Sequence, residues 1–170
     1  DQTDFLEIDT EEIEEVVEET LQPLSREGGE NPAKVVSELR EMMQNKAGII
    51  RTGGLLEEAL VELEEFRIRA ASTSPGGGRM YNPGWHQALE IEAMVDVSKM
   101  CAISALRREE SRGAHTRDDF PDTDHGHWGK VNSVIVMGDD GSMNIDFVSY
   151  PEIPEELKSL LDSDDLHEEE

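Results

Sequence analysis

Apolar residues recur at helical spacing through most of the first two thirds of the chain. In the segment DTEEIEEVVEETLQPL, Ile13, Val16, Val17 and Leu21 fall on one side of a helix, with glutamates between them. Pro23 is expected to end this helix, because proline has no N–H to donate and its ring clashes with the preceding turn. The apolar stripe is thin, so this first helix needs another surface to pack on.

Two amphipathic helices follow. Asn31-Pro32 combines a capping side chain with a proline at the first helical position, which predicts a helix that ends near Ala47-Gly48. The stretch GIIRT then reads as a short connection, with Ile49 and Ile50 as apolar anchors. Thr52 can cap the next helix, whose apolar stripe continues over about four turns.

The longest helix is predicted from Asn82-Pro83 to about Arg108, because the cap-then-proline start recurs there. Its apolar residues lie on more than one face, which is typical of a helix buried by several neighbours. Gly113 is expected to serve as its C-terminal cap. The glycines at 76–78 leave a helix rather than a strand, so they indicate a flexible connection and not a phosphate-binding loop.

The last third of the chain changes from helical to alternating patterns. VNSVIVM and SMNIDFVSY flank GDDG, which predicts a β-hairpin, and a lone hairpin must pack on another element to be stable. The segment PEELKSLL can form one or two helical turns, and the acidic end is expected to be disordered.

The expected fold class is therefore mainly α: an antiparallel three-helix bundle, spectrin-repeat-like, with a C-terminal β-hairpin and acidic flexible tails. The predicted domain organisation is an acidic N-terminal helix and linker at 1–30, the three-helix bundle at 31–112, a salt-bridged loop and hairpin at 113–150, and an acidic tail at 151–170.

Charge excludes several functions. The 170 residues carry a formal net charge of −25, so nucleic acids and anionic membrane surfaces, which are also negative, would repel the chain. We expect neither a signal peptide nor direct membrane insertion, because the sequence has no apolar run of about 18 residues. Cys101 is the only cysteine, which excludes a disulfide framework and a thiolate zinc cluster. Its apolar neighbours predict that it is a small buried residue.

Side chains that could bind a metal or take part in catalysis are concentrated between Glu109 and Trp128, in EESRGAHTRDDFPDTDHGHW. Imidazole and carboxylate groups suit zinc, iron or manganese. The candidate metal ligands are His115, Asp118, Asp119, Asp122, Asp124, His125 and His127. However, the inward-facing Glu-x-x-His pairs that build metal sites in helical bundles are absent. A nucleophile–base–acid set from Ser111, His115 and an aspartate is also conceivable, but nothing indicates a strained nucleophile turn.

The arginines of this stretch favour a structural role. Arg112 and Arg117 flank His115 among aspartates, and a guanidinium group binds carboxylates through two parallel hydrogen bonds. Such pairs can hold a loop rigid without a hydrophobic core. We therefore expect an ordered, salt-bridged loop between the bundle and the hairpin, anchored at its end by Trp128.

The same stretch resembles a known family. It closely resembles the segment ESRGAH-x-R-x-D-[YF]-P…W-x-K near the C-terminus of succinate dehydrogenase and fumarate reductase flavoprotein subunits. The matching residues are Glu110, Ser111, Arg112, Gly113, Ala114, His115, Arg117, Asp119, Phe120, Pro121, Trp128 and Lys130. The resemblance extends from about Asn31 to Tyr150. It departs at Thr123, at Gly129, at Val131-Asn132 and over the first thirty residues.

The resemblance implies that this is the C-terminal helical domain of such a subunit, with no catalytic, cofactor-binding or metal-binding residues of its own. It implies FAD in the full-length subunit, whose FAD-binding and capping domains would be partners, as would an iron–sulfur subunit. It places the complex in the cytoplasm, at the inner face of the membrane. The residues implied in the domain interface and structural motif are Ser111, Arg112, Gly113, His115, Arg117, Asp119, Pro121 and Trp128.

Two alternatives stay open at this point. L-aspartate oxidase carries a similar C-terminal motif, so the motif identifies the domain but does not distinguish succinate or fumarate from aspartate as the substrate. A free-standing acidic helical interaction module is the alternative from a different class, with the His/Asp loop as a possible metal ligand set. In the family interpretation, the isolated domain is expected to be inactive.

Overall fold

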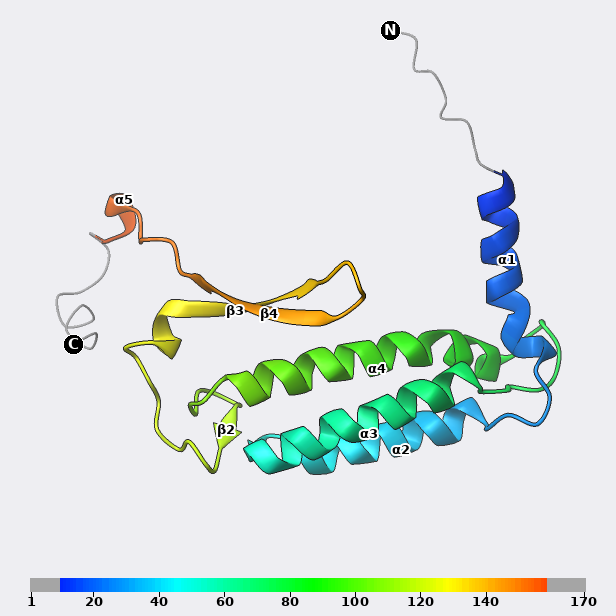
Figure 1. The fold of residues 1–170 in the computed structure, drawn as a ribbon, viewed down its shortest axis with the longest axis horizontal. Coiled ribbons are helices and arrows are strands. Elements are labelled where there is room, and N and C mark those ends of the chain that lie inside the picture. The colour runs from blue at the N-terminus through cyan, green and yellow to red at the C-terminus, as the bar shows by residue number, and fades with distance from the viewer. Residues whose placement is uncertain (1–9, 159–170) are drawn as a thin grey trace, which may run out of the picture. The chain divides into compact units, whose positions relative to one another are not determined.

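The structure, a computed structural model, describes residues 10–158 (Figure 1). The expected acidic tails fall partly on residues 1–9 and 159–170, which lie outside the described residues. The chain forms two compact units. One comprises the described parts of 1–41 together with 64–96, and the other comprises 42–63 together with the described parts of 97–170.

Four helices account for about half of the described residues, and a hairpin follows them. The helices are α1 (Thr10–Ser25), α2 (Pro32–Lys46), α3 (Gly53–Ala71) and α4 (Pro83–Arg107). The first unit contains α1, the start of α2, the end of α3 and the start of α4, and the second contains the other ends of α2, α3 and α4. In each unit, one end of α3 lies with the opposite ends of α2 and α4, so these three helices are antiparallel neighbours. The predicted three-helix bundle is therefore confirmed.

The apolar stripes predicted for these helices form the core of each unit. The first unit buries Val35, Val36, Leu39, Phe66, Ala70, Ala88, Ile91 and Val95. The second unit buries Met42, Leu56, Ala59, Leu63, Ala102, Ala105 and Trp128. The helix starts are also confirmed: the Asn31 and Asn82 side chains accept hydrogen bonds from Ala33 N and Trp85 N, at 2.9 and 3.1 Å.

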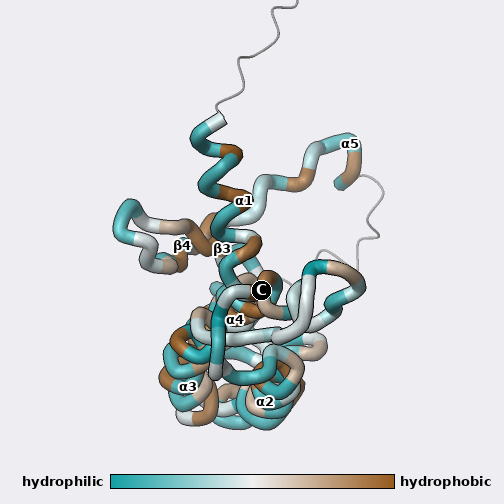
Figure 2. Tube along the Cα trace, turned by 90° about the vertical axis from the view of Figure 1, so that its right-hand side faces the viewer, coloured by the Kyte–Doolittle hydropathy of each residue, from teal (hydrophilic) through white to brown (hydrophobic). Residues whose placement is uncertain are grey.

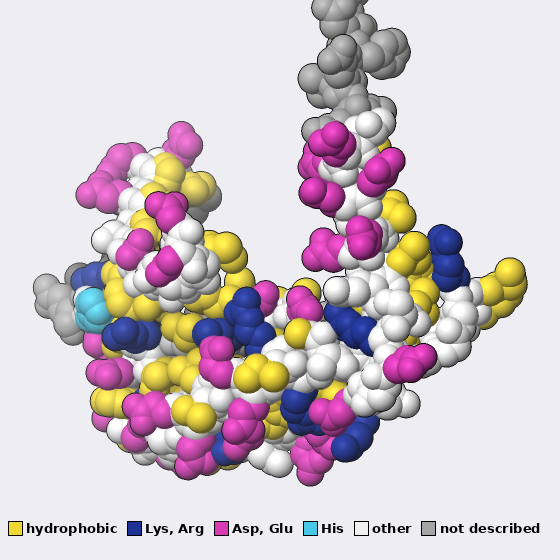
Figure 3. Space-filling view, turned by 45° about the vertical axis from the view of Figure 1, so that its right-hand side comes forward, with side chains coloured by type: hydrophobic (Ala, Val, Ile, Leu, Met, Phe, Trp, Pro, Cys, Tyr) yellow, Lys and Arg dark blue, Asp and Glu magenta, His cyan; other side chains and the backbone are white. Residues whose placement is uncertain are grey.

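Helix α1 alternates between apolar and polar residues along its length (Figure 2), and acidic side chains gather on it (Figure 3). The prediction that Pro23 ends this helix is wrong, because the helix continues to Ser25. Pro23 is buried in the last turn, and the Ser25 hydroxyl donates to the carbonyl of Gln22 at 2.7 Å.

Helix α4 is less completely buried than the apolar residues on its several faces predict. Ile91, Val95 and Ala102 are buried, but Val97 is 57% exposed and Cys101 is exposed as well. The expectation that Cys101 is buried is therefore wrong. The neighbouring helices cover only one side of α4, and both exposed residues lie outside that side.

The connection between α2 and α3 also differs from expectation. Ile49 and Ile50 are 63% and 64% exposed, so they are not apolar anchors. Instead, β1 (Ile50–Arg51) pairs in parallel with β2 (Thr116–Arg117), which belongs to the loop after α4. This contact joins segments that are far apart in the sequence and that no local pattern could pair.

The predicted hairpin is present. It follows a single 3-10 turn, Trp128–Lys130, and consists of β3 (Val131–Met137) and β4 (Met143–Ser149), paired antiparallel with Ile135 opposite Ile145. Apolar stretches run along both strands (Figure 2). Helix α5 (Glu155–Lys158) is the single described turn of the predicted C-terminal helix.

Candidate functional site

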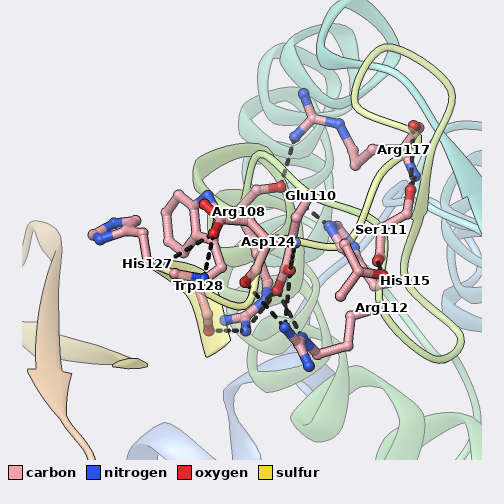
Figure 4. Close-up of polar contacts among 11 residues, drawn as sticks. Arg108, Glu110, Ser111, Arg112, His115, Arg117, Asp124, His127 and Trp128 are labelled. Atoms are coloured by element: carbon pink, nitrogen blue, oxygen red, sulfur yellow. Dashed lines mark hydrogen bonds and ion pairs between the residues drawn. The ribbon is translucent and has the colours of Figure 1, made fainter. Parts of the chain in front are cut away.

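The loop from Arg108 to Lys130 connects α4 to the hairpin and contains the residues singled out in the sequence. Figure 4 shows its polar side chains converging from both ends of the loop. Arg112 and His115 exchange two backbone hydrogen bonds, at 2.9 and 3.0 Å, across a tight turn that contains Gly113. Gly113 has a φ of +57°, a conformation that glycine adopts without steric cost.

A buried carboxylate lies at the centre of this loop. Glu110 is 0% exposed, and its side chain pairs with Arg108 at 2.9 Å and with Arg112 at 3.0 Å. The backbone N–H of Asp124 donates to the same carboxylate at 2.9 Å. Arg112 also donates to the carbonyl of Asp124 at 3.1 Å. Glu110 thereby joins the start of the loop to its far end (Figure 4).

The pKa of Glu110 reflects two opposing effects. Burial raises the pKa because it penalises the charged form, whereas the hydrogen bonds from Arg112 and Asp124 and the positive charge of Arg108 lower it. The balance leaves the pKa of Glu110 below its ordinary value. The carboxylate is therefore charged at neutral pH, and its charge belongs to the folded structure of the loop.

Arg117 ends helix α4. Its side chain is buried, and its Nη1 donates to the carbonyls of Ala105, Leu106 and Arg108, at 2.9, 3.0 and 3.2 Å. The first two are carbonyls of the last turn of α4, which have no partner within a helix, and the third lies one residue beyond the helix. A cation there also suits the helix dipole. The prediction that Gly113 caps this helix is wrong, because Arg117 performs that role and Gly113 lies six residues beyond the helix end.

The remaining nitrogens of Arg117 bind Asp119. Both bonds are 2.8 Å long, in the two-bond arrangement expected from the sequence. Asp119 also accepts a hydrogen bond from the backbone N–H of Gly53, at the start of α3, at 2.8 Å. The Arg117 guanidinium holds the pKa of Asp119 well below its usual range. This ion pair therefore connects the end of α4 to the start of α3.

His115 is fixed as a neutral imidazole. Arg51 Nη1 lies 2.7 Å from its Nδ1, and the carbonyl of Arg108 lies 3.2 Å from its Nε2. Because an arginine can only donate, Nδ1 must accept, so Nε2 carries the proton and donates to the carbonyl. Burial lowers the pKa of His115, and the charges of Arg51 and Arg117 lower it further.

Ser111 forms hydrogen bonds with the backbone of the loop. Its hydroxyl lies 2.9 Å from the carbonyl of Phe120, to which it donates, and it accepts from the N–H of Arg117 at 2.9 Å. The nitrogens of His115 are engaged by Arg51 and Arg108. The structure therefore does not bring Ser111 and His115 together as a nucleophile and its base.

The candidate metal ligands do not converge either. Within residues 10–158, no group of three histidine, cysteine or acidic side chains comes together. Asp124 accepts hydrogen bonds from the N–H groups of Gly126 and His127, at 2.8 and 2.9 Å, and so shapes a turn. His125 and Pro121 are exposed.

Trp128 anchors the end of the loop, as the sequence predicts. It is buried, its ring packs edge-on against Phe147 of the hairpin at 5.2 Å, and the Arg108 guanidinium lies over it at 5.5 Å. Arg108 also donates to the carbonyl of Trp128 at 2.8 Å. The hairpin is thus connected to the same charged cluster as the loop.

Sequence reasoning missed several members of this cluster. It identified Arg112 and Arg117 but expected aspartate partners for both, and the partner of Arg112 is Glu110. Arg108 and Arg51 were not singled out. Glu110 enters the sequence analysis only as a residue of the family motif, because it and Arg108 lie in a run of charges, RREESR, where exposure to solvent is the ordinary expectation.

Comparisons with known proteins agree on one family. The model of the family described as fumarate reductase flavoprotein C-term matches residues 36–160. The fumarate reductase flavoprotein subunit of Mycobacterium tuberculosis is 32% identical over 123 residues, which cover 72% of this chain and 21% of that protein. The subunit of the same name from Helicobacter pylori is 30% identical over 153 residues, covering 87% of this chain and 21% of that protein.

The fold is similar to that of a solved complex. The structure of the Mycobacterium smegmatis Sdh1 complex in its apo form contains a chain with a TM-score of 0.82 and 32% identity, and the match covers 98% of this chain and 29% of that one. The present chain therefore spans about a fifth of the length of the curated relatives it matches. Among its described helices, none has both the length and the apolar character needed to cross a membrane.

Proposed function

This chain belongs to the family of fumarate reductase flavoprotein C-terminal domains, and from that premise we propose that it supports the flavin-binding part of a succinate dehydrogenase or fumarate reductase subunit. In this proposal the domain carries no active site. FAD and the interconversion of succinate and fumarate belong to the remainder of the subunit. An iron–sulfur subunit is the proposed further partner, in a complex at the cytoplasmic face of the membrane.

The observation that carries this proposal is the charged cluster around Glu110. Its arginines are engaged in contacts within the domain: Arg108 and Arg112 bind Glu110, and Arg117 binds Asp119 and the end of α4. Within residues 10–158, no buried side-chain nitrogen or oxygen lacks a hydrogen-bond partner. A cluster so fully occupied suits a rigid support, since rigid elements are what position a reactive site elsewhere.

The experiment compares this chain with the complete subunit that contains it. Each is purified and examined for flavin absorbance and for dye reduction with succinate and with L-aspartate. We expect bound flavin and succinate-dependent reduction in the complete subunit, and neither in the chain alone. Activity of the chain alone would contradict the proposal, and a preference for aspartate would favour L-aspartate oxidase instead.

A substitution tests the supporting role. In the complete subunit, Arg112→Ala should release FAD more readily, because the loop loses a connection between its two ends. The isolated chain with the same substitution should keep its helical circular-dichroism signal. Loss of that signal would show that the bundle itself depends on Arg112, which the proposal does not expect.

A further inference from the structure

The hairpin has two open edges, and its register shows which backbone groups face outward. Gly138 N donates to Ser142 O at 2.8 Å, and Tyr150 N donates to Lys130 O at 2.9 Å. In an antiparallel pair, hydrogen-bonded residues alternate with residues whose N–H and C=O point away from the partner strand. Counting in twos from these bonds, the outward-pointing residues of β4 are Met143, Ile145, Phe147 and Ser149, and those of β3 are Val131, Ser133, Ile135 and Met137.

The edge of β4 borders a groove. The groove has a volume of about 520 Å³. Leu60 of α3 and Ile103 and Leu106 of α4 line one side, and residues 143–146 of β4 line the other. The lining includes residues of β4 and none of β3, so the groove lies on the β4 side of the hairpin. Three apolar side chains of α3 and α4 thus lie beside the unpaired backbone donors and acceptors of β4.

Such an edge is unusual in a folded protein. Among residues 10–158, no third strand pairs with either β3 or β4. A two-stranded sheet is marginally stable in water, and proteins ordinarily cover or charge a long strand edge to prevent pairing with other chains. Arg107 and Asp146 contribute one charge of each sign to the groove, so the groove carries no net charge from its lining.

We propose that an extended segment of the remainder of the flavoprotein subunit pairs with the open edge of β4 as a third strand. Its backbone would bond to Met143, Ile145 and Phe147, and its apolar side chains would contact Leu60 and Ile103. The occupant is assigned from chain length, because this chain covers only 21% of the Mycobacterium tuberculosis relative and 29% of the matched Mycobacterium smegmatis chain. The inference rests on the proposed function and names the surface through which the domain is attached.

Backbone hydrogen exchange tests the pairing in the complete subunit. The outward amides of Met143, Ile145 and Phe147 should exchange as slowly as the inward amide of Asn144, and about tenfold or more slowly than the outward amide of Ile135 on the other edge. Rapid exchange of the outward β4 amides, equal to that of Ile135, overturns the proposal. Slow exchange of these amides in the 170-residue chain alone also overturns it, since the occupant would then lie within this chain or a second copy.

A matched pair of substitutions provides a second test. Ile145→Pro and Ile135→Pro remove the same side chain from directly opposed residues, and each removes only an outward N–H, which a strand edge tolerates. After proteolytic nicking between the flavin-binding part and this domain, Ile145→Pro should speed separation of the two parts by about tenfold or more relative to Ile135→Pro. Equal separation rates contradict the proposal. If both variants fail to fold, the exchange measurement on the unsubstituted subunit decides.

The strand pairing and the proposed function can be disproved separately, by different measurements. If the complete subunit binds flavin, reduces dye with succinate and keeps this domain attached after nicking, the proposed function stands whatever the exchange rates show. Rapid β4 exchange in that subunit then overturns only the strand pairing. A complete subunit without flavin or succinate activity overturns the proposed function itself.

Discussion

Glu110 is a carboxylate without solvent exposure, and its surroundings explain how the loop keeps a charge there. Removing a charge from water is costly, and the cost is offset only when hydrogen bonds and opposite charges replace the lost hydration. Arg108, Arg112 and the N–H of Asp124 supply them. At the residue scale, stability of the loop thus depends on a few specific contacts.

Glu110→Gln should lower the free energy of unfolding by about 1–3 kcal/mol, because the amide keeps the shape but leaves Arg108 and Arg112 without their anion. Urea unfolding followed by circular dichroism measures the change. Glu109→Gln is the matched control: the neighbouring residue is exposed, so its substitution should cost less than about 0.5 kcal/mol. Equal effects of the two substitutions would show that burial of Glu110 has no energetic consequence.

His115 should make stability depend on pH near neutrality. Its pKa in the folded state lies below the ordinary value of about 6.5, so the unfolded chain binds the proton more readily. The contribution of neutral His115 is therefore complete above that ordinary value and is lost as the pH falls through the folded-state pKa. Urea unfolding between pH 5 and 8 should show stability rising with pH, and NMR titration should give the lowered pKa directly.

His115→Gln is the control for this dependence. Glutamine can accept from Arg51 and donate to the carbonyl of Arg108, but it does not titrate. The slope of stability against pH should therefore be smaller in the variant. An unchanged slope would assign the dependence to another group.

At the scale of elements, two helix starts share the same sequence signature but have different surroundings. The Asn31 side chain only accepts from Ala33 N. The Asn82 side chain accepts from Trp85 N and also donates to the carbonyls of Gly76 and Gly78, at 2.7 and 3.0 Å. Asn82 therefore caps α4 and fixes the glycine-rich connection before it.

Asn82→Ala should cost about 2 kcal/mol of stability and Asn31→Ala about 1 kcal/mol, because only the former loses loop contacts in addition to the cap. Thermal or urea unfolding gives both values. Asn82→Asp keeps the capping oxygen and loses the amide donors, so it should fall between the unsubstituted chain and Asn82→Ala. Equal losses for the two alanine variants would contradict a role for Asn82 in the loop.

At the scale of the whole molecule, the net charge of −25 should make stability depend on salt. Helix α1 alone places Glu11 and Glu15, Glu14 and Glu18, and Glu15 and Glu19 four residues apart. Like-charged pairs at this spacing destabilise a helix by about 0.2–0.5 kcal/mol each. Their combined repulsion is then of order 1 kcal/mol, and salt screens it.

The melting temperature should therefore rise between about 0.01 M and 1 M NaCl, over which the Debye length falls from about 30 Å to 3 Å. Sucrose, which also favours compact states but carries no charge, provides the control. A melting temperature that rises equally in sucrose, or that does not rise in NaCl, would show that charge repulsion is not a significant term in this molecule.

The helix starts, the antiparallel bundle and the hairpin could be predicted from the sequence alone. Asn31-Pro32, Asn82-Pro83 and GDDG act through neighbours within a few residues, so their effects can be read from a local pattern. The pairing of Arg117 with Asp119, two residues apart, belongs to the same class. Helix ends were less predictable, as the two residues beyond Pro23 show.

Which charged groups are buried, and which apolar groups are exposed, depends on the tertiary structure. Glu110 is buried because Asp124 approaches it across the loop, and Arg51 reaches His115 from 64 residues away. Cys101 is exposed because no described helix covers its side of α4. Burial depends on contacts between distant segments, and neither periodicity nor composition contains the information about which segments will meet.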